Sequence, residues 1–125
     1  MPRSIMDQVK EARALTPDIS PQEAMALHGR PDVVFVDVRE GEELAATGKA
    51  SGAVHASRGT LEFKADPALP SRNPALSPEK TVILYCASGG RAALAGAALR
   101  ELGYEDVRNL GGFKDWAEAG GPVER

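Results

Sequence analysis

The distribution of apolar residues along the chain predicts four β-strands. Two apolar runs, Val33 to Val38 and Thr81 to Cys86, do not alternate with polar residues, as expected of strands that are covered on both faces. Weaker strands are expected over Ala53 to His55 and Asp106 to Leu110. Short runs of this kind are typical of a parallel sheet that is buried between helices.

Helical spacing and capping residues predict four helices between and around these strands. Ser20, Pro21 and Glu23 supply an N-cap, a proline in the first turn and the acidic residue of a capping box, so a helix should begin there. The other three helices are expected after Ser4, from Arg91 to Leu102 and from Phe113 to Ala119.

The order of these elements predicts the α/β class. Strands that are separated by helical segments imply a mostly parallel central sheet with helices on both faces. We expect one domain over residues 17–125, preceded by a helical extension over residues 1–16. The segment from Leu61 to Lys80 carries four prolines, which exclude a long regular element and indicate an excursion over the surface.

Composition narrows the classes of function and partner. The 125 residues are 42% apolar and 26% charged, which fits one globular domain. A net charge of −3 excludes a general basic surface, so we expect no nucleic-acid partner and no membrane partner. The single cysteine excludes an intramolecular disulfide and indicates a reducing compartment, and the charged N-terminus is unlike a signal peptide, so a cytoplasmic location is expected. The sequence indicates no oligomeric state.

The strongest chemical signal lies between Tyr85 and Arg91, where the only cysteine, Cys86, ends a buried strand. Open α/β sheets bind their ligands at this edge. Gly89 and Gly90 allow successive N–H groups to point into one concavity, and the positive end of the following helix also attracts anions. A cysteine in such a concavity is expected to be stabilised as the thiolate, which is the nucleophilic form.

Each residue of this segment also has a purely structural interpretation. A lone cysteine at a strand end is commonly an inert core residue, although that role does not require the Ser-Gly-Gly-Arg sequence that follows. Arg91 either offers a planar fork of donors to an oxyanion or is an ordinary solvated arginine. Ser88 either donates to a sulfur anion or caps the helix.

Other candidate groups favour structural roles. His28 and His55 lack partners at metal-ligand spacing, so no metal and no cofactor is expected. Asp37 and Arg39 lie at the end of the first strong strand, at the same sheet edge as Cys86. We expect the segment from Asp37 to Glu40 to form a buried ion pair that ties the loops together.

Taken together, these segments resemble the rhodanese, or thiosulfate sulfurtransferase-like, family from about Thr16 to Val123. The resemblance depends on the order and spacing of four motifs, each weak alone: Asp37 to Glu40, Gly48 to Ala56, Tyr85 to Ala92 and Gly103 to Trp116. The second motif departs mildly from the family, because Lys49, Ala50 and Ser51 stand where histidine, isoleucine and proline are usual.

The resemblance implies a sulfurtransferase, in which a cysteine takes a sulfane sulfur from a donor such as thiosulfate and passes it on from a persulfide. Carried over, Cys86 is the catalytic nucleophile, Asp37 supports the loop from beneath, and Arg58 lies at the pocket rim. The substrate-binding cradle consists of Ala87, Ser88, Gly89, Gly90 and Arg91. The implied partners are a small-molecule sulfur donor and a thiol, cyanide or protein acceptor.

Two alternatives remain open on the same fold. A phosphatase or arsenate reductase is disfavoured, because those relatives have five residues between cysteine and arginine, whereas Cys86 to Arg91 spans six residues in all. The loop also lacks an acidic residue that would protonate a leaving alcohol. A non-catalytic rhodanese module that binds or senses a partner would be favoured by loss of the cysteine, which is present here.

Overall fold

The central sheet is parallel, with the strand order β3-β1-β4-β5, in a computed structural model that describes residues 2–125. The strands of this sheet are β1 (Val33–Asp37), β3 (Val54–His55), β4 (Thr81–Cys86) and β5 (Val107–Gly112). A separate antiparallel pair joins β2 (Lys49–Ala50) to β6 (Val123–Glu124). The predicted α/β class with a mostly parallel sheet is confirmed.

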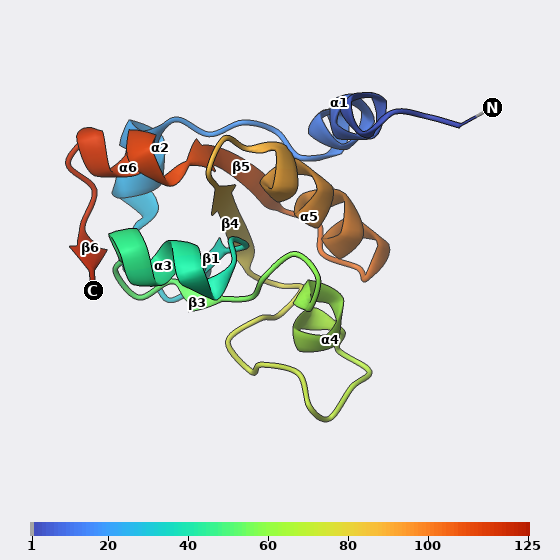
Figure 1. Cartoon of the computed structure of the whole chain (residues 1–125). Coiled ribbons are helices and arrows are strands. Elements are labelled where there is room, and N and C mark those ends of the chain that lie inside the picture. Colours follow the sequence, from blue (N-terminus) through green and yellow to red (C-terminus); the bar gives the residue numbers. More distant parts are fainter. Residues whose placement is uncertain (1) are drawn as a thin grey trace.

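Helices cover both faces of the sheet, as Figure 1 shows. The helices are α1 (Ile5–Leu15), α2 (Pro21–Leu27), α3 (Gly41–Thr47), α4 (Leu61–Ala65), α5 (Gly90–Glu101) and α6 (Phe113–Glu118). Helices α4 and α5 share one apolar cluster with β1 and β4, and α2 and α6 share a second cluster with the opposite faces of the same strands. None of the helices in residues 2–125 has the length and apolar composition needed to cross a bilayer.

The start of α2 follows the predicted capping box. The Ser20 hydroxyl accepts a hydrogen bond from the Glu23 N–H at 3.1 Å, and the Glu23 carboxylate accepts one from the Ser20 N–H at 3.1 Å. Ser4 and Asp7 cap α1 in the same reciprocal way. The capping residues of the sequence were therefore sufficient to locate both helix starts.

Four short elements were not predicted: α3, α4, β2 and β6. Helix α4 has only five residues and lies within the proline-rich excursion, which otherwise lacks regular structure as expected. Strands β2 and β6 have two residues each and pair across more than seventy residues of chain, as the register of Lys49 with Glu124 shows. Their pairing is a tertiary contact that local sequence patterns do not report.

The N-terminal helix α1 packs directly on α5, and the two lie side by side in Figure 1. Val9 and Ala12 are buried in a cluster with Ala93. The hydroxyl of Thr16, which is fully buried, donates to the Ala93 carbonyl at 3.1 Å. Gly96 leaves the space that Thr16 fills, because a side chain at position 96 would collide with it. The contact between α1 and α5 is therefore close and specific in shape.

A buried ion pair lies at the carboxyl end of β1. The Asp37 carboxylate accepts hydrogen bonds from Arg39 Nε at 3.0 Å and from Arg39 Nη2 at 2.8 Å. The same guanidinium donates to the Gly48 carbonyl at 2.9 Å and lies over the Phe113 ring, 4.5 Å from its centroid. The pair expected from the sequence is thus present, and it joins β1 to the end of α3 and to α6.

Replacing Asp37 with alanine should lower the free energy of unfolding by about 3–5 kcal/mol, because the Arg39 guanidinium would remain buried without its counter-charge. Urea denaturation followed by circular dichroism measures this change. The matched control is Glu118→Gln, which removes the carboxylate of an exposed pair with Lys114 and should cost less than about 1 kcal/mol. Equal effects of the two substitutions would contradict the role of the buried pair.

Candidate active site

Cys86 is the last residue of β4, and its side chain is 1% exposed. Alternation along the strand directs Leu84 and Cys86 into the cluster shared with α5, whereas Tyr85 points into the cluster shared with α6. The cysteine therefore lies at the sheet edge where strand β4 meets the loop that leads to α5. This is the position at which open α/β sheets bind ligands.

The loop that follows Cys86 wraps closely around its sulfur atom. The Gly89 N–H donates to Cys86 Sγ at 2.9 Å. Gly89 has φ +98° and ψ −10°, a left-handed conformation that glycine adopts without strain, and it is the N-cap of α5. Ala87 and Ser88 are exposed, and Gly89 rather than Ser88 occupies the N-cap position of α5, where no side chain caps the helix. An amide donor and a helix N-terminus thus both face the sulfur, an arrangement that stabilises negative charge there.

Arg91 in the first turn of α5 binds a carboxylate from α3. Its Nη1 donates to Glu43 Oε1 at 2.7 Å, and its Nη2 donates to Glu43 Oε2 at 3.0 Å. The two hydrogen bonds that Arg91 donates to Glu43 are the main cause of the raised pKa of Arg91, and the nearby Cys86 raises it further. Arg91 is therefore neither freely solvated nor a bare cation: a bidentate pair holds it beside the cysteine.

The Arg91 pair also determines the charge of Glu43. Hydrogen bonds from Arg91 lower the pKa of Glu43 from 4.5 to about 2. Because folding lowers this pKa, the stability that the carboxylate contributes is complete above about pH 4.5 and is lost as the pH falls towards 2. The link between α3 and the loop therefore persists at neutral pH.

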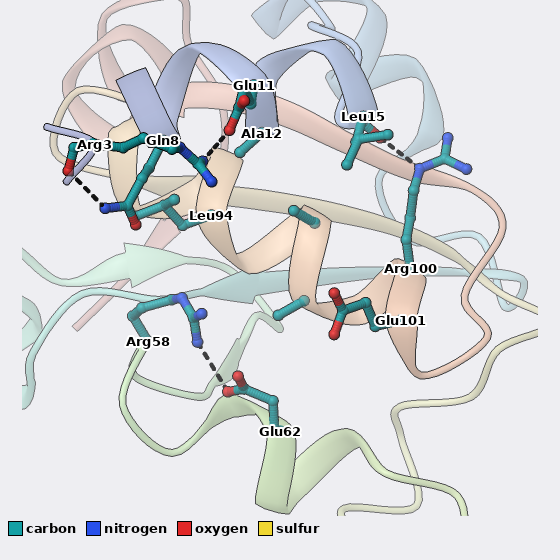
Figure 2. Close-up of a pocket in the computed structure, with 12 residues that line it drawn as sticks. Arg3, Gln8, Glu11, Ala12, Leu15, Arg58, Glu62, Leu94, Arg100 and Glu101 are labelled. Carbon is teal, nitrogen blue, oxygen red and sulfur yellow. Dashed lines mark hydrogen bonds and ion pairs between the residues drawn. The ribbon is translucent and has the colours of Figure 1, made fainter. Parts of the chain in front are cut away.

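Arg58 lies on the surface shown in Figure 2, and its backbone N–H donates to the Val38 carbonyl at 3.1 Å. Its Nη1 donates to Glu62 Oε1 at 2.9 Å. Both residues line an open groove of about 540 Å³ between α1, α5 and α4, with an apolar floor that includes Leu94 and Ala98. None of residues 86–91 lines this groove. Ala87 to Arg91 follow Cys86 in the loop and the first turn of α5, whereas the Arg58 side chain pairs with Glu62 at this groove. The place of Arg58 at the rim of the substrate pocket stays a prediction.

Asp37 is the last residue of β1 and lies beside β4, and its support of the cysteine loop stays a prediction. In the register of β1 with β4 it pairs with Tyr85, the neighbour of Cys86. Burial raises the pKa of the Tyr85 hydroxyl, and the hydrogen bond with Asp37 raises it further, so this hydroxyl stays protonated at neutral pH. Tyr85 in turn accepts a hydrogen bond from the Ala50 N–H at 3.0 Å. The contacts of Asp37 therefore fix the strand that carries the cysteine.

Two residues at the site were missed by the analysis of the sequence. Glu43 belongs to α3, a helix that was not predicted, so its contact with Arg91 had no local signal beyond the acidic composition of Glu40 to Glu43. Asn109 donates from Nδ2 to the Gly89 carbonyl at 3.0 Å.

Among the described residues, no three His, Cys, Asp or Glu side chains gather as a metal-binding group.

Several solved structures share this fold. A protein from Rhodopseudomonas palustris, described as of unknown function and a possible tyrosine phosphatase, is 38% identical, with a TM-score of 0.90 over 99% of this chain and 96% of that chain. The polysulfide-sulfur transferase homodimer of Wolinella succinogenes is 40% identical, with a TM-score of 0.74 over 94% of this chain and 85% of that chain. The first of these similarities covers nearly the whole chain, α1 included.

Similar curated proteins include tRNA uridine(34) hydroxylases and a sulfurtransferase. A tRNA uridine(34) hydroxylase of Synechocystis is 33% identical over 94% of this chain, but this chain spans only 41% of that protein. A sulfurtransferase of Allochromatium vinosum is 33% identical over 74% of this chain and 78% of that protein. The chain thus spans less than half of the hydroxylase and most of the sulfurtransferase.

The family model of the rhodanese-like domain matches residues 20–119, which include every strand of the central sheet and the whole cysteine loop. The match agrees with the motifs around Asp37, Cys86 and Gly111 that the sequence presents in the same order. The chain belongs to the rhodanese-like domain family.

Proposed function

We propose that this protein is a sulfurtransferase that carries a sulfane sulfur on Cys86. The observation that carries the proposal is the contact of the Gly89 N–H with Cys86 Sγ at the N-terminus of α5, with the Arg91 guanidinium nearby. Relatives named sulfurtransferase and polysulfide-sulfur transferase favour the same chemistry. A nucleophilic thiol that has no second cysteine to pair with fits the reducing cytoplasm.

In the first half-reaction the Cys86 thiolate attacks the outer sulfur of a donor such as thiosulfate. A new S–S bond forms on Cys86 Sγ, the S–S bond of thiosulfate breaks, and sulfite leaves with the electron pair of that bond. The terminal sulfur of the persulfide is an anion. The Gly89 N–H and the N-terminus of α5 supply partial positive charge where this anion is expected to lie.

In the second half-reaction an acceptor nucleophile attacks the terminal sulfur. With cyanide, a C–S bond forms, the persulfide S–S bond breaks and thiocyanate leaves, which returns Cys86 to the thiolate. A thiol or a protein acceptor would react in the same way and carry the sulfur away as its own persulfide. No other cysteine exists in the sequence, so the sulfur has to leave the chain to complete the cycle.

Replacing Cys86 with serine should abolish sulfur transfer and leave the fold intact, because serine nearly preserves the volume but lacks a nucleophilic thiolate. Intact-protein mass spectrometry after incubation with thiosulfate or polysulfide should show one added sulfur atom on the wild-type chain and none on the variant. Cyanide or dithiothreitol should remove that sulfur. Thiocyanate production measures turnover, and circular dichroism checks the fold.

Two outcomes would contradict the proposed function. If no donor places sulfur on a reduced Cys86 that iodoacetamide can alkylate, a non-catalytic module that binds a partner becomes the better account. Cys86-dependent release of phosphate from an aryl phosphate, in place of sulfur transfer, would favour the phosphatase chemistry suggested for the relative from R. palustris. Substantial sulfur transfer by a folded C86S variant would exclude Cys86 as the carrier.

If Arg91 also contacts the anionic end of the donor, Arg91→Ala should raise the KM for thiosulfate roughly ten- to a hundredfold, the loss expected for one charge-assisted hydrogen bond. Glu43→Gln is the matched control, because it keeps an oxygen acceptor for the guanidinium and leaves the Arg91 charge in place. This control should not raise KM. Steady-state kinetics with thiosulfate and cyanide measures both variants.

The comparison separates binding of the donor from attachment of the loop to α3. An equal rise in KM for the Arg91 and Glu43 variants would assign Arg91 only to the ion pair. Arg91→Lys should restore the KM incompletely, because an ammonium group cannot replace the planar fork.

A further inference from the structure

Strand β5 has an irregularity beside the cysteine loop. Its ladder with β4 pairs Leu84 with Asn109 and then Tyr85 with Gly111, so Leu110 is an extra residue without a partner. Gly111 has φ +93°, which only glycine adopts readily. A bulge of this kind bends a strand and redirects the side chains next to it.

The side chain of Asn109 is 2% exposed and uses both ends of its amide. Its Oδ1 accepts a hydrogen bond from the Gly111 N–H at 2.8 Å, which closes a turn over the bulge. Its Nδ2 donates to the Gly89 carbonyl at 3.0 Å. The two partners, one donor and one acceptor, fix the orientation of the amide, because the reversed amide would face a donor with a donor.

The backbone of Asn109 is itself held on the side away from β4. Its N–H donates to the Pro17 carbonyl at 2.8 Å, and its carbonyl accepts from the Ile19 N–H at 3.0 Å. The segment between α1 and α2 therefore pairs with β5 at this residue. The backbone of Asn109 is therefore held by hydrogen bonds that do not involve the cysteine loop. Because of these bonds, Asn109 is a rigid support for the loop.

Strand β5 touches the cysteine loop at a second place. Cys86 pairs with Gly112 in the ladder, and a side chain at position 112 would collide with the carbonyl oxygen of Ala87. The loop thus lies against the bulge through Ala87 and Gly89, on either side of the exposed Ser88. These contacts determine how the loop backbone passes over the sulfur.

We propose that Asn109 is a positioning residue for sulfur transfer, which holds Gly89 so that its N–H points at Cys86 Sγ. Glycine at a positive φ has a wide choice of backbone conformations, and rotation at Gly89 would turn the N–H away from the sulfur. The bond from Asn109 to the Gly89 carbonyl opposes that rotation. The role in transfer rests on the proposed function, whereas the effect on the reactivity of Cys86 does not.

Two substitutions test this role. Asn109→Ser keeps a short acceptor for the Gly111 N–H but does not reach Gly89, and Asn109→Asp places oxygen against the Gly89 carbonyl. Each should slow alkylation of Cys86 by iodoacetamide at neutral pH about tenfold, as expected when a hydrogen bond to a charged sulfur is weakened. Each should also shorten the lifetime of the persulfide formed with thiosulfate, measured by mass spectrometry.

The matched control is Asn73→Asp, which makes the same change of charge at the only other asparagine. Asn73 Oδ1 accepts from the Ala75 N–H at 2.9 Å in the proline-rich excursion, and aspartate retains this bond. The control should react as the wild type does. Rates are compared at a temperature at which circular dichroism shows every variant folded, so that a loss of stability alone does not alter them.

Wild-type alkylation rates in both folded Asn109 variants would overturn the positioning role, whatever the wild-type chain does with thiosulfate. A wild-type chain that accepts no sulfur, but whose Asn109 variants are still alkylated more slowly, would refute the proposed function and leave the positioning of Gly89 supported. Slower alkylation together with a shorter persulfide lifetime would support both.

Discussion

The charge of Arg39 has to be accommodated inside the protein, and the way in which this is done determines the arrangement around the cysteine. Its guanidinium is balanced by Asp37 and covered by the Phe113 ring. It also binds the carbonyl of Gly48, at the C-terminus of α3, and thereby holds that helix against the sheet edge. Helix α3 carries Glu43, whose carboxylate forms an ion pair with Arg91 at the start of α5. One buried charge is thus connected through two ion pairs to the loop that encloses the sulfur.

The cysteine loop is held from two sides by different kinds of interaction. On the side of α3 the contact is a charged pair at the surface, in which both side chains are about one third exposed. On the side of β5 it is a neutral amide that is almost completely buried. Charged contacts at a surface weaken with added salt, whereas buried neutral hydrogen bonds do not. The contact with β5 is therefore less sensitive to salt than the contact with α3.

The sequence predicted the parts of this structure that depend on local patterns. The strands that end at Asp37 and Cys86 are continuous apolar runs, and the start of α2 at Ser20 has a complete capping signal. These features located the sheet edge and the nucleophile candidate. A buried ion pair within the segment Asp37 to Glu40 was also predicted, and the structure forms it between Asp37 and Arg39.

The residues that hold the loop were not predictable in this way. Glu43 comes from a seven-residue helix with no buried residue, which leaves no apolar periodicity to detect. Asn109 acts through a bulge whose position depends on the register between β4 and β5. Both contacts span many residues of chain, 48 from Glu43 to Arg91 and 20 from Gly89 to Asn109. Such contacts are set by the assembled fold and not by the neighbouring sequence.

The depth of Cys86 restricts the shape of any molecule that reacts with it. A side chain that is 1% exposed, at the base of a loop, admits only an atom that projects from its parent molecule. Small anions with a projecting terminal atom satisfy this condition. A protein acceptor satisfies it only if its reactive group stands clear of its own surface, on an extended tail or at the tip of a loop. Among large acceptors, selection would then depend first on whether the reactive group can reach the Cys86 sulfur, and only then on binding affinity.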